Sequence, residues 1–524
     1  MLTALRHCGR LLGVARGLAR HDALGFVARL GPAPGLKLAL RLATLGARRR
    51  PDLPAGEGER LAAALRSLGP AYIKLGQMLA TRPDLVGREL AQGLMTLQDR
   101  LPPFPAGDVH AAIAEALGAP VDALFTAFDD TPVAAASIAQ VHKAQVHREG
   151  TREGATVAVK VLRPGIEERF ARDLDTFGWL AATAERHLPA SRRLRPVAVV
   201  ETIAQGVAAE MDLRLEAAAA SDLAANMAGE PGYRIPAVDW QRTARRVLTM
   251  EWIDGVALTD GPALKAAGHD RAALAGVVVR TFLTQAVRDG FFHADLHQGN
   301  LIVEPDGTIA AVDFGIVGRL DRATSRYLAE ILWGFLQRDY ARVAQLHFDA
   351  GYVPADRSVD QFALALKAIG EPIMGKPVSE ISVGRLLAQL FATTEAFDMQ
   401  TQPQLLMLQR TMVMVEGMAL HLDAHANMWE LSRPVVEAWM VDQLSPEVRL
   451  ADTINRTLKA MTRLPDLVDR AGRLIDRLEA ADKWVDGRAA RSTAHPARAT
   501  SGRGAAAAVG IVAVILVLAV LLAP

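Results

Sequence analysis

The sequence predicts an α+β protein with a small β-rich lobe, a larger helical lobe, a helical N-terminal extension and one C-terminal transmembrane helix. The small lobe is indicated by "IAQVHKAQV" (138–146) and "ATVAVKVL" (155–162), two β-like runs whose charged, glycine-containing connection is typical of a hairpin. Helical periodicity then extends from about residue 166 to 228, and "RRVLTMEWI" (245–253) is typical of a buried strand. "NLIVEPDGTIAAVDFG" (300–315) adds two short strands around a turn, and helical patterns dominate afterwards.

These patterns divide the 524 residues into six segments, and half of the residues are hydrophobic, which is enough for a substantial core. The expected segments are a basic helical stretch (1–54), a helical extension (55–115), the β-rich lobe (116–255), the helical lobe (256–445), an arginine-rich helical linker (446–503) and a transmembrane anchor (504–524).

The overall charge excludes one class of partner. Lys and Arg total 59 and Asp and Glu total 58, so the net charge of +1 gives no reason to expect a nucleic-acid partner.

Cys8 is the single cysteine, which excludes an intramolecular disulfide framework and fits a reducing compartment. The first 20 residues hold four arginines and no acid. They favour an amphipathic basic helix, with a transit peptide or a membrane-surface contact as the alternatives.

The C-terminal end predicts a membrane span. Residues 505–523 are uncharged and almost wholly apolar, and as a helix they would extend about 28 Å, close to the thickness of a bilayer core. Four arginines precede this run and Asp486 is the one acid nearby, so the positive-inside rule places the large N-terminal part in the cytoplasm. We therefore expect a single-pass, C-terminally anchored protein.

Four residues match the chemistry of phosphoryl transfer. Lys160 lies on the strand "VAVKV", "HADLHQGN" supplies Asp295 and Asn300, and "DFG" supplies Asp313. Together they match the protein-kinase signature set in order, residue type and context. Phosphoryl transfer needs a cation on the α/β-phosphates, metal-holding oxygens and a carboxylate that orients the nucleophile. Lys160 fits the first role, Asn300 and Asp313 the second, and Asp295 the catalytic third, so a protein-kinase-like two-lobed fold is expected.

The strand lysine also needs a carboxylate partner from a helix. "AAEMDLRLEAAA" offers Glu210 and Glu216, and Glu210 is the first choice. "TMEWI" falls where the strand linking the lobes should pass the adenine, so backbone groups near Glu251 and Ile253 are expected to bind its edge.

The segment expected over the ATP phosphates contains no glycine. We expect it to comprise Val133, Ala134, Ala135, Ala136, Ser137, Ile138, Ala139, Gln140 and Val141. Alanine is less flexible than glycine, so this loop should be stiffer than a kinase glycine-rich loop. Two further departures are Ala294, where kinases carry the arginine of HRD, and the absence of an APE-like segment after DFG.

A metal centre built on histidines is the alternative for the HADLHQGN loop, because His293 and His297 flank Asp295. No further ligands cluster nearby in the sequence, so we interpret both histidines as orienting residues of a kinase-like loop.

Several motifs in order resemble the UbiB family of atypical kinase-like proteins. "SLGPAYIKLGQMLATRPDLVG" carries the KxGQ residues Lys74, Gly76 and Gln77. The alanine loop, an ExD pair at Glu210 and Asp212, the later Glu216, HADLHQGN, DFG and "QRTMVMVEG" (409–417) follow in the expected order. The resemblance covers residues 55 to 440.

The resemblance implies a kinase-like fold whose KxGQ helix packs across the site where a peptide would bind, with Lys74 and Gln77 reaching toward the nucleotide and the ExD acids. It also implies ATP or ADP with Mg²⁺, ATPase activity rather than protein phosphorylation, and a role in ubiquinone biosynthesis. The expected location is the bacterial inner membrane, or the mitochondrial inner membrane in a eukaryote. The expected partners are a membrane lipid or polyprenyl-quinone precursor and other quinone-biosynthesis enzymes.

Two other functions stay open on the sequence alone. "HADLHQGN" also resembles the catalytic loop of aminoglycoside and choline kinases, which predicts a small-molecule phosphotransferase. A non-catalytic lipid-binding scaffold is the third reading, although it would not need to keep Lys160, Asp295, Asn300 and Asp313.

Overall fold

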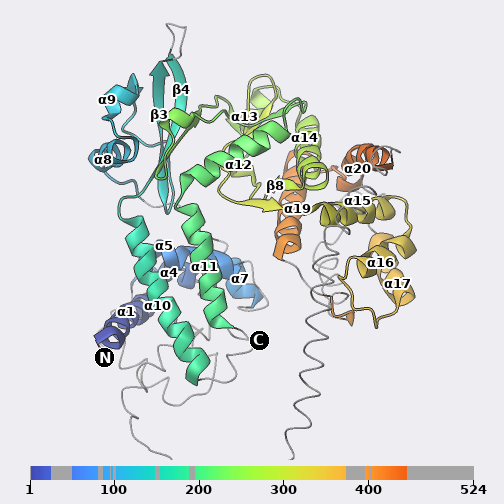
Figure 1. The fold of residues 1–524 in the computed structure, drawn as a ribbon, viewed down its shortest axis with the longest axis horizontal. Coiled ribbons are helices and arrows are strands. Elements are labelled where there is room, and N and C mark those ends of the chain that lie inside the picture. Colours follow the sequence, from blue (N-terminus) through green and yellow to red (C-terminus); the bar gives the residue numbers. More distant parts are fainter. Residues whose placement is uncertain are drawn as a thin grey trace, which may run out of the picture.

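The computed structural model has a small β-rich lobe, a larger, mainly helical lobe and a helical extension (Figure 1). It describes residues 2–24, 50–80, 87–94, 96–97, 102–147, 154–187, 195–372, 393, 396–399 and 403–444. The predicted linker (446–503) and anchor (504–524) lie outside these residues. Within the described residues, no helix combines the length and apolar character needed to cross a bilayer.

The small lobe is a five-stranded antiparallel sheet in the order β1-β3-β4-β6, with β2 also paired to β3. Its strands are β1 (Ala127–Phe128), β2 (Ala134–Ala135), β3 (Ala139–His147), β4 (Gly154–Leu162) and β6 (Val247–Glu251). The predicted hairpin is β3–β4, and the predicted strand "RRVLTMEWI" contains β6. On β4, Val157, Val159 and Val161 alternate with Lys160, because successive side chains of a strand point to opposite faces.

Helices cover both faces of this sheet (Figure 1). On one face, α8 (Ala106–Leu117) and α9 (Val121–Leu124) bury Val109, Ile113 and Phe125 against the three β4 valines. On the other side, α12 (Leu213–Asn226) contacts β6. The lysine on β4 therefore faces the side of the sheet opposite its valine core.

The helical extension packs below the small lobe (Figure 1). It comprises α1 (Leu2–Arg20), α4 (Glu57–Leu68), α5 (Pro70–Ala80) and α7 (Arg88–Leu94), which pack with α10 (Ile166–His187) and α11 (Pro196–Glu210). Helices α4 and α7 approach at Gly58 and Gly93, where a Cβ on Gly93 would lie 2.4 Å from the Gly58 backbone. The basic helix α1 is docked on α10, because Arg10 donates to the Arg172 carbonyl at 2.9 Å.

The long helical pattern predicted from 166 to 228 is divided in three, and its last break decides the site. Helix α11 ends at Glu210, and α12 begins after Asp212, whose carboxylate accepts a hydrogen bond from the Arg214 N–H at 3.2 Å. This N-cap satisfies a backbone donor that the new helix would otherwise leave free. The break lets α11 join the extension while α12 packs on the small lobe.

The larger lobe is mainly helical and carries two small sheets. One sheet has the order β5-β10-β9-β7 and the other pairs β11 with β8. These strands are β5 (Tyr233–Arg234), β7 (Val256–Ala257), β8 (Phe291–His293), β9 (Leu301–Val303), β10 (Ile309–Ala311) and β11 (Val317–Arg319). The helices are α13 (Gly261–Ala266), α14 (Arg271–Leu283), α15 (Arg322–Leu336), α16 (Tyr340–Asp349), α17 (Val359–Gly370), α19 (Pro403–Leu422) and α20 (Met428–Leu444). Single turns of 3₁₀ or π helix occupy Trp240–Arg242, Thr284–Asp289 and Gln298–Asn300.

One strand of the larger lobe comes from an unexpected part of the chain. Strand β5 lies between α12 and β6, which both belong to the small lobe, yet it pairs in parallel with β10. Arg234 on β5 binds Glu304 after β9 at 2.8 Å and Glu251 at the end of β6 at 2.9 Å. The two lobes are therefore joined by side chains as well as by the chain itself.

Candidate active site

Lys160 is the centre of the charged cluster between the lobes. Its Nζ donates to the two carboxylate oxygens of Glu216 at 2.7 and 2.9 Å and to Asp313 Oδ1 at 3.4 Å. Burial disfavours the charged form, but the carboxylates of Asp313 and Glu216 outweigh it and raise the pKa of Lys160 above its usual range. The lysine is thus a permanent cation held by one residue from each lobe.

The first choice for the lysine partner, Glu210, is wrong. Glu210 binds Lys74 instead, with Nζ and Oε2 3.0 Å apart. The reason is the break between α11 and α12, which a continuous helical pattern does not reveal. Glu210 lies on the last turn of α11, which packs in the extension, whereas Glu216 lies on the first turn of α12, beside the sheet.

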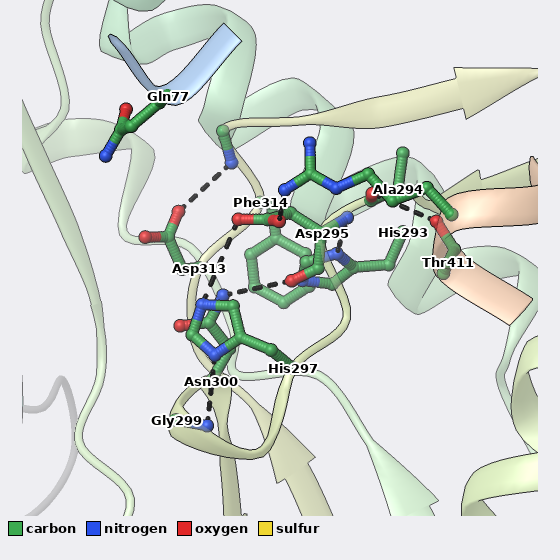
Figure 2. Close-up of polar contacts among 12 residues, drawn as sticks. Gln77, His293, Ala294, Asp295, His297, Gly299, Asn300, Asp313, Phe314 and Thr411 are labelled. Carbon is green, nitrogen blue, oxygen red and sulfur yellow. Dashed lines mark hydrogen bonds and ion pairs between the residues drawn. The ribbon is translucent and has the colours of Figure 1, made fainter. Parts of the chain in front are cut away.

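The HADLHQGN loop connects β8 to β9 and is held by its own polar groups (Figure 2). The Asp295 N–H donates to His293 Nδ1 at 3.2 Å, and Asn300 Nδ2 donates to the Asp295 carbonyl at 3.3 Å. Burial lowers the pKa of His293, so the ring is neutral and can accept that hydrogen bond. Both histidine and asparagine therefore orient the backbone around Asp295, in agreement with the interpretation of His293 as an orienting residue.

Helix α19 contributes two residues that were not predicted from the sequence to belong to the site. Arg410 donates to Asp295 Oδ1 at 3.1 Å, and the Thr411 hydroxyl donates to the Ala294 carbonyl at 3.0 Å (Figure 2). Arg410 and Thr411 lie in the "QRTMVMVEG" motif, and Ala294 stands where kinases carry an arginine. The missing arginine at Ala294 and the arginine in the QRTMVMVEG motif could together have predicted this contact. A loop without its own arginine can receive one from elsewhere in the fold.

The DFG segment connects the catalytic loop to Glu216. The Phe314 N–H donates to Glu216 Oε1 at 3.4 Å, and the Phe314 ring is buried against His293, with centroids 5.5 Å apart. Burial would raise the pKa of Asp313, but the neighbouring Lys160 ammonium outweighs it, and with the Gly315 N–H lowers that pKa to about 2. Asp313 is therefore a carboxylate at any physiological pH.

The residues predicted to hold a divalent cation have suitable donor atoms. Mg²⁺ prefers oxygen ligands, often one or two carboxylates together with substrate phosphates. Among the described residues, the hydrogen bonds of Asp313 use Oδ1 and that of Asn300 uses Nδ2. Oδ2 of Asp313 and Oδ1 of Asn300 are therefore the oxygens that could face a ligand. The donor set of these two residues thus fits a hard cation.

The alanine segment forms a tight turn between β2 and β3. The Ala136 N–H donates to the Ala139 carbonyl at 2.7 Å, and the guanidinium of Arg163 donates twice to the Ala136 carbonyl, at 3.1 and 2.9 Å. Of the nine residues predicted here, Val133 directly precedes β2 and donates its N–H to the Val141 carbonyl at 2.9 Å. Ala134 and Ala135 lie on β2, Ala136 to Ile138 form the turn, and Ala139 to Val141 lie on β3.

The predicted adenine-binding residues lie at the exit from β6. Glu251 ends the strand, and its N–H donates to the Ala237 carbonyl at 2.8 Å, so this amide is used within the protein. Ile253 follows in the link to β7 and its side chain is buried. The structure thus brings both residues to the link between the lobes.

The KxGQ residues lie on α5. Lys74 reaches the ExD acid Glu210, as described above, and Gln77 donates to the Leu97 carbonyl at 3.3 Å. A Cβ on Gly76 would lie 2.3 Å from a Leu97 methyl and 2.7 Å from one of Leu65. Glycine at this position therefore allows α5 to pack closely against its neighbours. Asp212, the second ExD acid, caps α12 and binds Arg214.

Comparison with known proteins agrees with this arrangement. The ABC1 atypical kinase-like domain matches residues 96–347, and the UbiB helical domain matches residues 366–427. A protein of Aeromonas salmonicida (strain A449) named "Probable protein kinase UbiB" is 43% identical over 424 residues, which cover 80% of this chain and 76% of that protein. This chain belongs to the UbiB family of atypical kinase-like proteins. The resemblance inferred from the motifs is thereby confirmed.

A second relative and a solved structure are also similar to this chain. A protein of the same name from Marinobacter nauticus is 41% identical over 428 residues, covering 80% of this chain and 77% of that protein. A solved structure, the complex of Rv3197 with erythromycin from Mycobacterium tuberculosis, superimposes with a TM-score of 0.50 and 24% identity, over 72% of this chain and 90% of that one. The latter likeness concerns the fold alone. This UbiB-family chain therefore has a kinase-like ABC1 domain with a helical extension.

Proposed function

We propose that this protein is an ATP-dependent, kinase-like enzyme that binds Mg-ATP or Mg-ADP and supports ubiquinone biosynthesis. The observation that carries the proposal is the ion-pair cluster of Lys160 with Glu216 and Asp313. Figure 2 shows Asp313 beside the loop that carries Asp295. A cation placed between two lobes, next to oxygen donors and a further carboxylate, is the constellation that phosphoryl transfer requires.

Each residue of the cluster has a role in this proposal. Lys160 would bind the α/β-phosphates, and Glu216 would hold its side chain in place through the hydrogen bonds described above. Asn300 and Asp313 would hold Mg²⁺, which when bound neutralises developing charge on the phosphates. Asp295, held by Arg410 and Asn300, would orient the attacking hydroxyl or water.

Two features support turnover of nucleotide rather than phosphorylation of proteins. Helix α5 is joined to the end of α11 through the Lys74–Glu210 pair, so the extension is fixed close to the site. After DFG, strand β11 is separated from α15 by Leu320 and Asp321 alone, which leaves no length for a peptide-docking segment. A substrate would therefore have to be small or lipid-like to reach Asp295.

The location and partners are part of the same proposal. We place the protein at the bacterial inner membrane, held by the span 504–524 that the sequence predicts. A membrane lipid or polyprenyl-quinone precursor would then be the molecule on which nucleotide turnover acts, with other quinone-biosynthesis enzymes as partners.

The test is a quinone profile of a deletion strain that carries the wild-type gene, an Asp313→Asn variant or an Asp306→Asn control. Asp306→Asn removes the same charge as Asp313→Asn, but in an exposed turn, where Asp306 accepts hydrogen bonds from Thr308. We expect wild type and the control to restore quinone and to hydrolyse ATP in purified form, and Asp313→Asn to do neither. Full quinone production by Asp313→Asn would favour the scaffold function, and a phosphorylated small product would favour the small-molecule phosphotransferase.

A further inference from the structure

Arg163 holds the turn over the proposed phosphate site by three contacts. Its guanidinium donates to the Ala136 carbonyl through Nε and one terminal nitrogen, at 3.1 and 2.9 Å. Its backbone N–H donates to the Ile138 carbonyl at 2.8 Å. Because the Ala139 carbonyl accepts from the Ala136 N–H at 2.7 Å, these three carbonyls of the turn are all bonded within the protein.

This arrangement has a direct electrostatic consequence for an anion. Carbonyl oxygens repel phosphate oxygens, whereas backbone N–H groups attract them. A hydrogen bond to each carbonyl removes part of this repulsion, and at Ala136 two N–H groups of the planar guanidinium converge on the one carbonyl oxygen, which fixes its direction. The rigidity of the turn thus has a second source besides its alanines.

The same guanidinium also contacts residues 102–104, which lie between α7 of the extension and α8 of the small lobe. The terminal nitrogen that binds Ala136 lies 2.9 Å from the Pro102 carbonyl, and the guanidinium lies over the Phe104 ring at 5.4 Å. On β3, directly after the turn, the buried Gln140 accepts from the Phe104 N–H at 3.0 Å. Residues 102–104 are thereby tied to the turn from two directions.

We propose that Arg163 is a positioning residue for the nucleotide, which sets the affinity for its phosphates by holding the alanine turn and tying it to residues 102–104. This inference rests on the proposed function, since it assumes that the turn covers bound phosphates. It adds a route by which the extension reaches the nucleotide site, because a displacement of residues 102–104 would release the turn.

The experiment compares wild type with Arg163→Met, Arg163→Lys and the control Arg172→Met. Methionine keeps much of the arginine length but removes every guanidinium contact, and lysine keeps the charge but not the fork. Arg172 is an exposed arginine on α10 whose Nε contacts the Glu168 carbonyl of its own helix. For each protein, one measures the Kd for Mg-ADP and Mg-ATP, KM and kcat for ATP hydrolysis, the melting temperature, and hydrogen exchange over residues 133–141.

For Arg163→Met we expect both Kd values and the KM to rise about tenfold or more, because charge-assisted hydrogen bonds that shape the bound site are lost. The kcat should stay within about twofold of the wild-type value, because the lost contacts would stabilise the bound nucleotide and the transition state equally. Exchange over 133–141 should accelerate, Arg163→Lys should lie between Met and wild type, and Arg172→Met should equal wild type. If Arg163→Met does not fold, Arg163→Lys carries the comparison.

The inference is overturned if a folded Arg163 variant binds both nucleotides as wild type does, or if exchange over 133–141 is unchanged. A second check is a double-mutant cycle with Phe104→Ala, whose effect on nucleotide affinity should disappear once Arg163 is Met. Additive effects would contradict the coupling to residues 102–104. Failure of the wild-type protein itself to bind or hydrolyse ATP would instead contradict the proposed function.

Discussion

Arg410 and Asp295 are 115 residues apart in the sequence, yet the guanidinium of one donates to the carboxylate of the other at 3.1 Å. The contact links α19 of the UbiB helical region to the HADLHQGN loop of the ABC1 region. It supplies that loop with an arginine at the point where Ala294 replaces one. The helical region is therefore part of the site and not an appendage to it.

We expect Arg410→Gln to lower the kcat of ATP hydrolysis about 10- to 100-fold while changing the KM for ATP little, because the lost charge-assisted bond orients Asp295 and not the nucleotide. The matched control is Arg433→Gln, which removes an exposed arginine paired with Glu437 on the neighbouring α20. Steady-state kinetics of both variants would decide. Equal kcat values for Arg410→Gln and the control would contradict a role for the α19 arginine.

Glu216→Gln and Glu210→Gln should have different effects, although both change a carboxylate to an amide in the same region. Glu216 is buried and accepts two of the three hydrogen bonds that Lys160 donates, so its loss should destabilise the fold by about 3 kcal/mol, as is usual when one partner of a buried pair is removed. Nucleotide binding should be lost with it. Glu210→Gln should leave Lys160 in place and loosen α5 only. Chemical denaturation and nucleotide titration would show the difference. If Glu210→Gln lost more stability and nucleotide affinity than Glu216→Gln, Glu210 would again be the better candidate for the partner of Lys160.

The two close-packed glycines of the extension should tolerate alanine unequally. Gly93→Ala would place a Cβ 2.4 Å from the Gly58 backbone and must separate α4 from α7, whereas Gly76→Ala meets only the ends of leucine side chains, which can shift to other rotamers. We expect Gly93→Ala to cost about 2 kcal/mol or more and Gly76→Ala less. Gly417→Ala on α19, where nothing lies within 4 Å, should stabilise the protein by about 0.5–1 kcal/mol. Thermal melts of the three variants test this order.

His347 should make the helical lobe sensitive to mild acid. Burial lowers its pKa from the usual 6.5, while its Nδ1–H donates to the Val343 carbonyl at 2.8 Å. The unfolded chain therefore binds a proton more readily than the folded one, so the stability contribution is complete above about pH 6.5 and falls as the pH drops below it. His347→Asn keeps a donor for Val343 without a titrating ring, and should flatten the dependence of the unfolding free energy on pH below 6.5. The exposed His425→Asn variant should keep the wild-type slope.

Much of the fold follows from local sequence patterns. The β3–β4 hairpin, strand β6 and the pair β9–β10 were all predicted, because alternation and turn residues act over short distances. Lys160, Asp295, Asn300 and Asp313 could be found for the same reason, since each lies in a short motif.

What the sequence did not reveal depends on distant contacts. Because the helix breaks between α11 and α12, Glu216 and not Glu210 pairs with Lys160, and Glu210 pairs with Lys74. The hydrophobic periodicity of the sequence does not show this break, because it depends on how the two helices pack in the fold. Strand β5 has two residues and is defined by its pairing with β10 alone. Arg163 and Arg410 are common residue types whose roles come only from what the fold places beside them.

Strand β5 also affects how the lobes can move. The chain passes from α12 in the small lobe to β5 in the larger one, returns through β6, and passes again to β7. A single flexible link permits rotation about many axes, but several crossings tied by Arg234 to Glu251 and Glu304 leave few axes along which all of them can bend together. Opening of the proposed nucleotide site should therefore be a small, directed rotation, and a wide rotation would first have to break the pairing of β5 with β10.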